Sequence, residues 1–526
     1  MDNALPFYNI YGGTQDNGSQ GVPSRTMNRA GIRTSDWMNT GGGDGFQSRA
    51  DYTDPSTVYT CSQNINCSRM DLKTGASVSI RPRFGEEDAR LRARWDIPFI
   101  LSPHSHTRLY IAANRLMRSD DRGATWKLVS PDLTRNIDRD TIPVMGRLWG
   151  ADAVWKNAFT DLFGTATAVA ESPVKEGVLF VGTDDGLVQI SEDGGQIWRK
   201  VDKFPGVPDM TYVTDVFPSP HDVNAVFVTL NDFHRGNFKP YVMKSTDLGR
   251  TWSSVSGDLP VRDPVWTVVQ DAVNPNLLFI GTEFGLSFTV DGGRHWVKIQ
   301  GGMPIIPIRD LEIQARESDL VAASFGRGFF VLDDYAALRG LTPQLLSQEG
   351  ALFAPGRKAR QYEEVGYYRA QGDNIASPNP PPGALLTYYL REDLPNAAAG
   401  AAGPKVVLTV ADSTGRQVRQ LDASSKAGLH RTPWDLREAA PPGQVGGRGT
   451  GQPAAVPAAA GGEPEAGAQG SRGGRGGVGG GGGRGFARSG PLVKPGSYQV
   501  TLGKLVNGTI TPLGQPQTVE VVPLEK

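Results

Sequence analysis

Four stretches of this 526-residue chain share one short pattern: Ser119–Trp126 (SDDRGATW), Ser191–Trp198 (SEDGGQIW), Ser245–Trp252 (STDLGRTW) and Thr289–Trp296 (TVDGGRHW). Each fits Ser/Thr-x-Asp-x-Gly-x-x-Trp. In such a stretch the Asp and Ser/Thr side chains bond backbone N–H groups of a tight turn, glycine permits positive φ, and the indole packs beneath. The pattern therefore predicts one hairpin tip four times. The predicted structural residues are Ser119, Asp121, Gly123, Trp126, Ser191, Asp193, Gly195, Trp198, Ser245, Asp247, Gly249, Trp252, Thr289, Asp291, Gly293 and Trp296.

Each copy belongs to a longer unit that recurs along the chain. Upstream of the last three copies, short apolar runs alternate with turn residues and indicate three strands, and a fourth strand follows the copy. The spacing between copies varies, as expected for a β-propeller with unequal loops and not for a solenoid. The unit therefore predicts one propeller blade, a four-stranded antiparallel sheet whose first strand lines the axis.

Weaker units extend the repeat in both directions. Residues 45–80 and 99–126 each give a unit, and residues 309–334 give three strands of a last one. Residues 7–19 align with the second strand of later units, so the first strand of that unit is missing. We predict an all-β chain with about seven blades over residues 1–337, the first incomplete. The missing strand favours the interpretation that Met1 is not the natural beginning, and that the chain is the carboxyl part of a longer protein.

The four copies resemble the Asp-box, or BNR repeat, of sialidases, xyloglucanase-type glycosidases and sortilin-type receptors, all of which are β-propellers. Further segments are similar to bacterial secreted proteins of the sortilin/glycosyl-hydrolase-like group: GGTQDNGS (12–19), GGGDGF (41–46), SPDLTRN (130–136) and SFGRGFFVLDD (324–334). The resemblance implies a propeller and an extracellular or periplasmic location. Because the matching motifs are mostly turn chemistry, it leaves the function open.

A second domain follows the repeat. Residues 338–383 are expected to form a linker, and alternating strands over residues 384–526 predict a small β-sandwich. Its pattern resembles the Ig-like domain of flagellar hook-capping proteins, and Trp434 is expected in the core. The residues that carry this resemblance are Asp412, Gly415, Arg419, Trp434, Asp435, Pro495, Gly496 and Tyr498.

Residues 441–490 interrupt this domain with a glycine-rich stretch that holds few large apolar side chains. Ordering a backbone costs roughly 1–2 kcal/mol per residue, which so little apolar surface cannot offset. We therefore expect a disordered inserted loop. Its Arg-Gly-Gly segments resemble RNA-binding sequences. With 54 Lys plus Arg against 55 Asp plus Glu, however, the chain offers no electrostatic basis for a nucleic-acid partner, and a flexible surface loop is favoured.

Composition and the two cysteines bear on the compartment. No apolar run of about 18 residues predicts a membrane span, and residues 1–13 lack the features of a signal peptide. Cys61 and Cys67 flank a predicted hairpin turn, so they either form a local disulfide in an oxidising compartment or stay reduced. Two thiols without a nearby histidine supply too few ligands for a metal site.

A glycosidase needs two facing carboxylates, about 5–9.5 Å apart, near the axis where propellers bind ligands. Asp44, in the glycine-rich segment 41–46, is the weak catalytic candidate. The acidic residues of equivalent turns recur from unit to unit, which favours turn capping over catalysis. These residues are Asp16, Asp184, Asp185 and Glu283.

Other kinds of site find less support. A sialidase needs three arginines for a carboxylate, but the arginines of residues 81–94 read better as a solvated strand, and the Arg-Ile-Pro motif near the start of sialidases is missing. His104 and His106 form an H-x-H pair without an evident third metal ligand. No nucleophile elbow, phosphate loop or dinucleotide fingerprint is present. We predict neither a metal nor a cofactor.

The resulting hypothesis is a secreted protein that binds a polysaccharide or a protein at a propeller face without catalysis. Trp149, Trp155 and Phe159 lie in a long excursion between two units and are the predicted ligand-binding residues, because aromatic rings stack on sugars or anchor a partner. The same rings could equally pack over the propeller. The rival hypothesis is a sialidase- or xyloglucanase-like glycoside hydrolase whose active site is shared with a missing upstream propeller.

Overall fold

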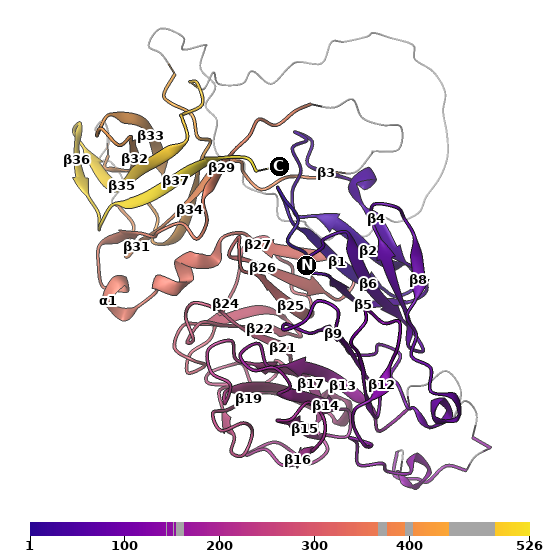
Figure 1. The fold of residues 1–526 in the computed structure, drawn as a ribbon. Helices are drawn as coiled ribbons and strands as arrows, with labels where there is room; N and C mark the ends of the chain where they lie inside the picture. The colour runs from indigo at the N-terminus through magenta and orange to yellow at the C-terminus, as the bar shows by residue number, and fades with distance from the viewer. Residues whose placement is uncertain are drawn as a thin grey trace, which may run out of the picture.

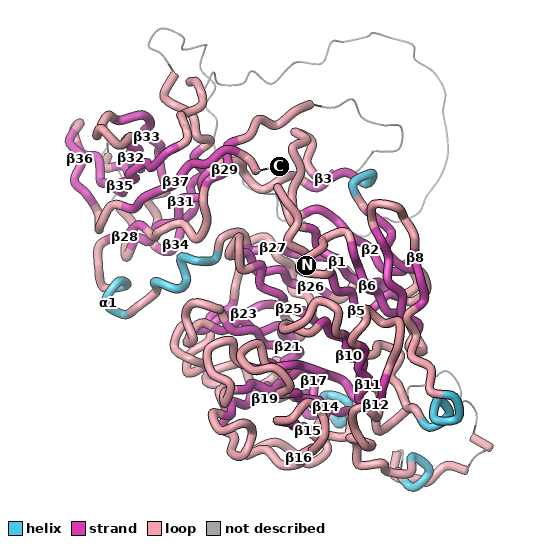
Figure 2. Tube along the Cα trace, in the orientation of Figure 1, coloured by secondary structure: helices cyan, strands magenta, loops and turns pink. Residues whose placement is uncertain are grey.

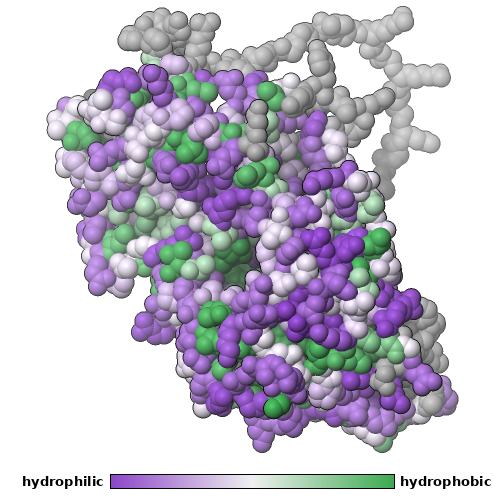
Figure 3. All heavy atoms as spheres, viewed as in Figure 1, coloured by the Kyte–Doolittle hydropathy of each residue, from purple (hydrophilic) through white to green (hydrophobic). Residues whose placement is uncertain are grey.

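The computed structural model describes residues 1–143, 145–150, 152–153, 162–366, 376–394, 403–440 and 490–525. This part of the chain is nearly all β, as Figure 2 shows. Its short helical segments are η1 (Thr34–Asp36), η2 (Gly85–Arg90), η3 (Arg139–Thr141), η4 (Phe233–Arg235), η5 (Tyr335–Gly340) and α1 (Pro343–Leu346). None of the helices in these ranges has the length and hydropathy to cross a membrane. Hydrophilic and apolar residues alternate over the side of the molecule seen in Figure 3.

Seven antiparallel sheets follow one another over the first 332 residues, and we number them in chain order. Sheet 1 is β1 (Asn9–Thr14), β2 (Gly18–Pro23) and β4 (Met38–Gly41), and sheet 2 is β5 (Gly45–Ala50), β6 (Thr57–Ser62), β7 (Asn66–Asp71) and β8 (Ser77–Ser79). Sheet 3 is β9 (Phe99–Leu101), β10 (Leu109–Ala112), β11 (Leu116–Ser119) and β12 (Lys127–Leu128), and sheet 4 is β13 (Ala166–Glu171), β14 (Leu179–Thr183), β15 (Val188–Ser191) and β16 (Arg199–Val201).

The last three sheets repeat this order. Sheet 5 is β17 (Tyr212–Pro218), β18 (Val226–Asp232), β19 (Asn237–Ser245) and β20 (Ser253–Ser254), and sheet 6 is β21 (Val265–Gln270), β22 (Leu278–Thr282), β23 (Gly285–Thr289) and β24 (Val297–Lys298). Sheet 7 is β25 (Ile308–Gln314), β26 (Asp319–Ser324) and β27 (Phe329–Leu332). In sheets 4 to 7 the first strand of each sheet contacts the first strand of the next, as in a β-propeller, and the colours of Figure 1 follow the sheets in chain order.

Glycines on second strands let the next sheet approach. A Cβ atom at Gly182 would lie 2.5 Å from Val213 Cγ1, and one at Gly281 would lie 2.6 Å from the Ile308 carbonyl oxygen. A Cβ at Gly13 of β1 would lie 2.0 Å from the backbone of Gly45. These close approaches explain why β1, β14 and β22 each end in a Gly-Thr pair. By this contact β1 corresponds to a second strand of the later sheets.

The first and last sheets meet at a seam, which brings the two ends of the sheet series together (Figure 1). The Tyr8 hydroxyl donates to Asp319 of β26 at 3.1 Å, and the Met1 amino group lies 2.9 Å from Glu312 of β25. Tyr8, Ile10, Val22 and Val321 are buried together there. The seam thus joins residues more than 300 positions apart in the chain.

The four predicted turns have one common geometry, and we call them the box turns. In each, the Ser or Thr hydroxyl donates to the Asp carboxylate at 2.7–2.8 Å and accepts the glycine N–H at 2.7–3.1 Å. The glycine φ angles lie between +72° and +100°. Trp126, Trp198 and Trp296 donate their indole N–H to Ile80, Val129 and Val255, carbonyls just beyond the fourth strand of the preceding sheet. The box turns therefore fasten neighbouring sheets together.

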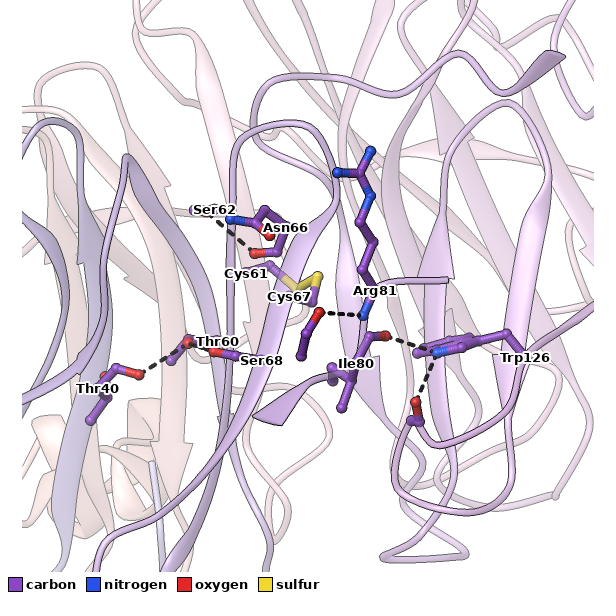
Figure 4. The surroundings of a disulfide bond; sticks show 12 residues. Thr40, Thr60, Cys61, Ser62, Asn66, Cys67, Ser68, Ile80, Arg81 and Trp126 are labelled. Carbon is purple, nitrogen blue, oxygen red and sulfur yellow. Dashed lines mark hydrogen bonds between the residues drawn. A yellow bond between two sulfur atoms is a disulfide. The ribbon is translucent and has the colours of Figure 1, made fainter. Parts of the chain in front are cut away.

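Cys61 and Cys67 are directly opposite each other on β6 and β7 and form a disulfide with a Cα–Cα distance of 4.0 Å (Figure 4). Both side chains are buried with Ile80 and Phe99, between sheets 2 and 3. A hollow of about 310 Å³ lies beside the bond and is lined largely by serine, threonine and glycine. The sequence left the state of these thiols open, and their cross-strand position brings them within bonding distance.

The C-terminal residues form two packed sheets. The small sheet is β28 (Gly350–Leu352), β31 (Ala384–Leu390) and β34 (Gly428–Trp434), and the large sheet is β29 (Ala359–Gln361), β37 (Gln517–Pro523), β35 (Gly496–Val506), β32 (Lys405–Ala411) and β33 (Gln417–Ala423), with β36 (Thr509–Pro512) beside β35. Trp434 is fully buried between them against Tyr498. The expected linker, 338–383, contributes β28 and β29, because these short strands complete sheet edges. Residues 441–489 of the glycine-rich segment lie outside the described residues.

Several contacts hold this domain against the seam. Arg360 pairs with Glu317 at 2.7 Å, and Arg357 lies 3.0 Å from the Asp319 carboxylate. Arg431 donates to the backbone carbonyl of Asp333. A two-residue pairing of β3 (Ile32–Arg33) with β30 (Ala376–Ser377) adds a further link. The C-terminal domain is thus joined to the seam by both side chains and backbone.

Candidate ligand-binding face

The starts of first strands and the ends of second strands lie together at one end of the sheets, which we call the axial face. The pairings Val265↔Thr282 and Ile308↔Ser324 place them there in sheets 6 and 7, and Gly45↔Ser62 does so in sheet 2. The box turns join third and fourth strands, so they lie at the opposite end. Candidate residues near the axis must therefore come from the loops of the axial face.

Arg309 is the most unusual side chain of this face. Its guanidinium carbon lies 3.4 Å from the ring centroid of Trp266 and 4.9 Å from that of Phe325. Its Nε is buried and has no hydrogen-bond partner, and within the described residues the guanidinium forms no ion pair. Burial lowers the pKa of Arg309, although the charge of Glu283 opposes this shift. An arginine is thus held by two rings with its N–H donors unused.

β-bulges position Arg309 and Trp266. The register of the first and second strands shifts by one residue between Val265 and Thr267 in sheet 6, and between Ile308 and Asp310 in sheet 7. The extra residues are Trp266 and Arg309. A bulge leaves one residue out of the ladder and redirects its side chain, and bulges are common beside binding sites. The corresponding residues of sheets 4 and 5 are the much smaller Thr167 and Thr214.

Neighbouring side chains extend this cluster. The Trp266 indole N–H donates to Glu283 at 2.8 Å, and the Phe233 ring lies edge-on to Trp266 with centroids 5.7 Å apart. His234 stacks on Phe233 at 4.0 Å, and its pKa is lowered by burial and by the positive charges of Arg94 and Arg309. We call Arg309, Trp266, Phe325, Phe233 and His234 the arginine–aromatic cluster. It brings three sheets together.

Two apolar rings protrude beside the cluster. Phe325 is 65% exposed in the turn after β26, and Phe284 is 44% exposed in the equivalent turn after β22. Single exposed apolar side chains are common on protein surfaces, so it is the place of these two rings on the axial face that makes them candidates for ligand contact. Aromatic faces next to polar donors are the usual composition of a site that binds sugars or peptides.

Asp44 also lies on the axial face, in a hollow of about 420 Å³ that it shares with Asp16 and Gly41–Gly43. One carboxylate oxygen accepts the Asp16 N–H at 2.9 Å, and the other accepts the Trp95 indole N–H at 2.8 Å. These bonds lower the pKa of Asp44. A general acid needs a raised pKa, so the lowered pKa argues against that role for Asp44, and its two bonds to the protein favour an anchoring role over that of a free nucleophile or base.

Of the three predicted ligand-binding residues only Trp149 is among the described residues, and it is not part of the cluster. Trp149 is 39% exposed, with Arg147 4.3 Å from its ring centroid. Trp155 and Phe159 lie outside the described residues. The acidic residues of the box turns bond their own turns, and hydrogen bonds from the Thr251 side chain and N–H lower the pKa of Asp247 in this way.

No metal centre is evident in the described part of the chain, where His, Cys, Asp and Glu form no group of three with suitable geometry. His104 Nε2 contacts the Ser172 carbonyl oxygen at 2.8 Å, and His106 Nδ1 contacts Asp51 at 3.0 Å. Each histidine of the H-x-H pair therefore has a separate partner, which gives the pair a role in local structure.

Sequence reasoning missed the arginine–aromatic cluster. One signal was available, because aligning the first strands of the units places Thr167, Thr214, Trp266 and Arg309 at one position. At this position the last two units have the large residues Trp266 and Arg309, whereas the two units before them have threonine. That departure has meaning only once the bulges show that these side chains leave the ladder.

Comparisons with known proteins add limited information. No family model matches the chain. A stretch of 105 residues is 32% identical to an oligoxyloglucan-reducing end-specific xyloglucanase from Emericella nidulans, and the match covers 20% of this chain and 11% of that protein. The chain therefore matches only about a tenth of the length of this curated relative.

Two solved structures illustrate the structural likeness. A GH74 xyloglucanase from Xanthomonas campestris has a TM-score of 0.42 at 15% identity, covering 81% of this chain and 70% of its own. The extracellular domain of a hybrid two-component system from B. thetaiotaomicron has a TM-score of 0.42 at 10% identity, covering 99% and 55%. With TM-scores below 0.5, neither structure adds to the fold described above, which rests on sheet order and contacts.

Proposed function

We propose that this chain is a secreted, seven-bladed propeller of the Asp-box type, with an incomplete first blade and an Ig-like sandwich, that binds a polysaccharide without cleaving it. The observation that carries the proposal is the arginine–aromatic cluster. It combines flat rings for sugar faces with unused donors for sugar oxygens, at the end of the sheets where loops converge. The bonded Asp44 carboxylate supports binding over catalysis. The local likeness to a xyloglucanase supports a polysaccharide over a protein ligand.

A glycoside hydrolase is the second candidate. The same likeness favours it, and so does the presence of two carboxylates, Asp16 and Asp44, around one hollow. Asp44 accepts the Asp16 N–H, so these two residues are neighbours on one side of the hollow, and the enzyme would still need a carboxylate that faces them across the substrate, which a further propeller could supply. Because the chain matches only a small part of that relative, activity on xyloglucan remains a proposal for this protein.

The test compares binding and turnover in the full chain. Binding to a panel of immobilised plant and bacterial polysaccharides is measured for the wild type and for Trp266→Ala. We expect binding that weakens by at least about fivefold in the variant, since an aromatic stacking contact contributes about 1 kcal/mol or more. Tyr52→Ala is the matched control, because Tyr52 is an aromatic residue 39% exposed just after β5, at the opposite end of sheet 2.

Reducing-end release is measured in parallel for the wild type and Asp44→Asn. We expect no release from either protein. Release that disappears in Asp44→Asn would establish the hydrolase instead. Binding to a protein partner with no polysaccharide bound would refute the choice of ligand, and equal losses from Trp266→Ala and Tyr52→Ala would refute the choice of face.

A further inference from the structure

We infer that the ligand of this face carries carboxylate groups, one of which pairs with Arg309. This inference rests on the proposed function, since it specifies the polysaccharide as one that contains uronic acid. Its starting point is the charge pairing around the cluster. Two other arginines on this side have acidic partners, with Arg135 2.8 Å from Asp209 and Arg94 2.9 Å from Asp96. Arg309 has none within the described residues.

The geometry of Arg309 leaves a defined part of the guanidinium for a ligand. The guanidinium carbon lies over the Trp266 and Phe325 rings, at 3.4 and 4.9 Å from their centroids, and neither ring provides a lone-pair acceptor for its N–H groups. Nε is buried without a partner. The remaining donors are those of the two terminal nitrogens. Their parallel N–H bonds match the two oxygens of a carboxylate.

The nearest acidic residue does not satisfy this group. Glu283 affects Arg309 only through its charge, while its carboxylate oxygen accepts the Trp266 indole N–H at 2.8 Å. Arg94 adds further positive charge near His234, as Arg309 does. A partly buried cation without a bonded counter-charge lowers stability. An anionic ligand would supply the missing partner at a position that two rings already fix, so little rotamer freedom is lost on binding.

A sugar acid fits this arrangement better than a peptide acid. The protruding Phe325 offers an apolar face next to the guanidinium, and apolar sugar faces stack on such rings. A uronic-acid unit carries its carboxylate directly on the sugar ring. The stacking surface and the carboxylate of such a unit are therefore close together, as are the Phe325 ring and the Arg309 guanidinium, whose carbon lies 4.9 Å from the ring centroid.

The experiment measures the affinity of the full chain for polygalacturonate, for the same polymer with methyl-esterified carboxyls, and for neutral xyloglucan. We expect polygalacturonate to bind at least tenfold more tightly than its ester. Arg309→Gln should abolish that preference, and Arg309→Lys should restore it only in part, because lysine keeps the charge without the fork. Arg327→Gln is the matched control. It removes an equal charge from the same exposed turn as Phe325, and should change affinity less than twofold.

Each outcome decides the inference. Equal affinity for the acid, the ester and xyloglucan overturns it and leaves the proposed function standing. Absence of binding to any polysaccharide overturns both. Arg309-dependent binding of polyglutamate without polysaccharide binding also overturns it and identifies an acidic polypeptide as the ligand. The comparison of acid with ester uses the wild type alone, so it decides the inference even if the Arg309 variants do not fold.

Discussion

Replacing Asp319 tests whether the seam between sheets 1 and 7 is held by one buried carboxylate. The Asp319 side chain is 0% exposed. It accepts the Tyr8 hydroxyl at 3.1 Å, the Asp334 N–H at 2.8 Å and an Arg357 N–H at 3.0 Å. Asp319→Ala leaves these three donors without their acceptor in a site that water cannot easily reach.

The cost follows from the separate losses. Breaking a buried ion pair costs about 3–5 kcal/mol, but Arg357 retains Glu317 at 3.5 Å and Asp333 at 3.9 Å, so the lower end applies. Each unsatisfied neutral donor adds about 1 kcal/mol. We expect Asp319→Ala, which leaves two neutral donors as well as Arg357 without this acceptor, to lower the free energy of unfolding by about 5 kcal/mol. Tyr8→Phe, which removes one hydrogen bond, should cost about 1 kcal/mol.

Amide hydrogen exchange of the whole chain is the appropriate assay, because a two-domain chain does not guarantee a two-state transition. Exchange in β1 and β26 should accelerate much more in Asp319→Ala than exchange in β17 and β18, on the far side of the ring. If both regions accelerate equally, or if Asp319→Ala costs no more than Tyr8→Phe, the carboxylate does not hold the seam.

Three further predictions concern separate sites. Burial raises the pKa of Asp184 to about 6, above its unfolded value of about 4, so this group should lower stability by on the order of 2–3 kcal/mol as pH rises from 4 through 6. Burial raises the pKa of Asp215 and Asp319 to about 6 as well, so the test is the difference between proteins: in Asp184→Asn the change in unfolding free energy from pH 4 to pH 6 should be more positive than in the wild type by that amount, and an equal change would contradict the prediction. Replacing both cysteines by serine should cost about 2 kcal/mol in denaturant titrations, because the disulfide closes only a short loop, and an unchanged midpoint would argue against the bond. Gly293→Ala should lower the melting temperature more than Gly292→Ala. Both glycines have positive φ, but only at Gly293 would a Cβ atom lie 2.6 Å from the Val255 carbonyl oxygen. Equal losses in the two variants would show that the φ angle alone determines the cost.

The sequence was most informative where local chemistry repeats. Hydroxyl, carboxylate, glycine and indole recur at fixed spacing in the box turns, and the hydroxyl, carboxylate and glycine act within eight residues, so the geometry of the turn was predictable although the distant carbonyls that the indoles reach were not. The strands around them alternate with turn residues and were predicted as four-stranded units. By contrast, β28 and β29 have three residues each. Strands this short carry no periodicity, and only their pairing partners reveal them.

The candidate site was less predictable, for a different reason. Arg309 and Trp266 come from bulged strands of two different sheets and Phe325 from a turn, and no local pattern connects them. Their roles depend on bulges, and a bulge is a property of the register between two strands. Asp44 was found from its glycine-rich surroundings, but its bonds to Asp16 and Trp95 come from other sheets. Sequence reasoning therefore located the loops of the axial face without identifying the residues that act there.

The backward reach of the box-turn tryptophans has a consequence for how the chain is made. Trp126, Trp198 and Trp296 each bond to a carbonyl of the sheet synthesised just before their own. A unit leaving the ribosome thus finds its docking surface already in place, and the ring can grow in the order of translation. The seam is the exception, because Tyr8 must wait for Asp319 and Arg357 to emerge. Until then, the amino-terminal strands have an unfilled flank that a chaperone or a neighbouring nascent chain could occupy.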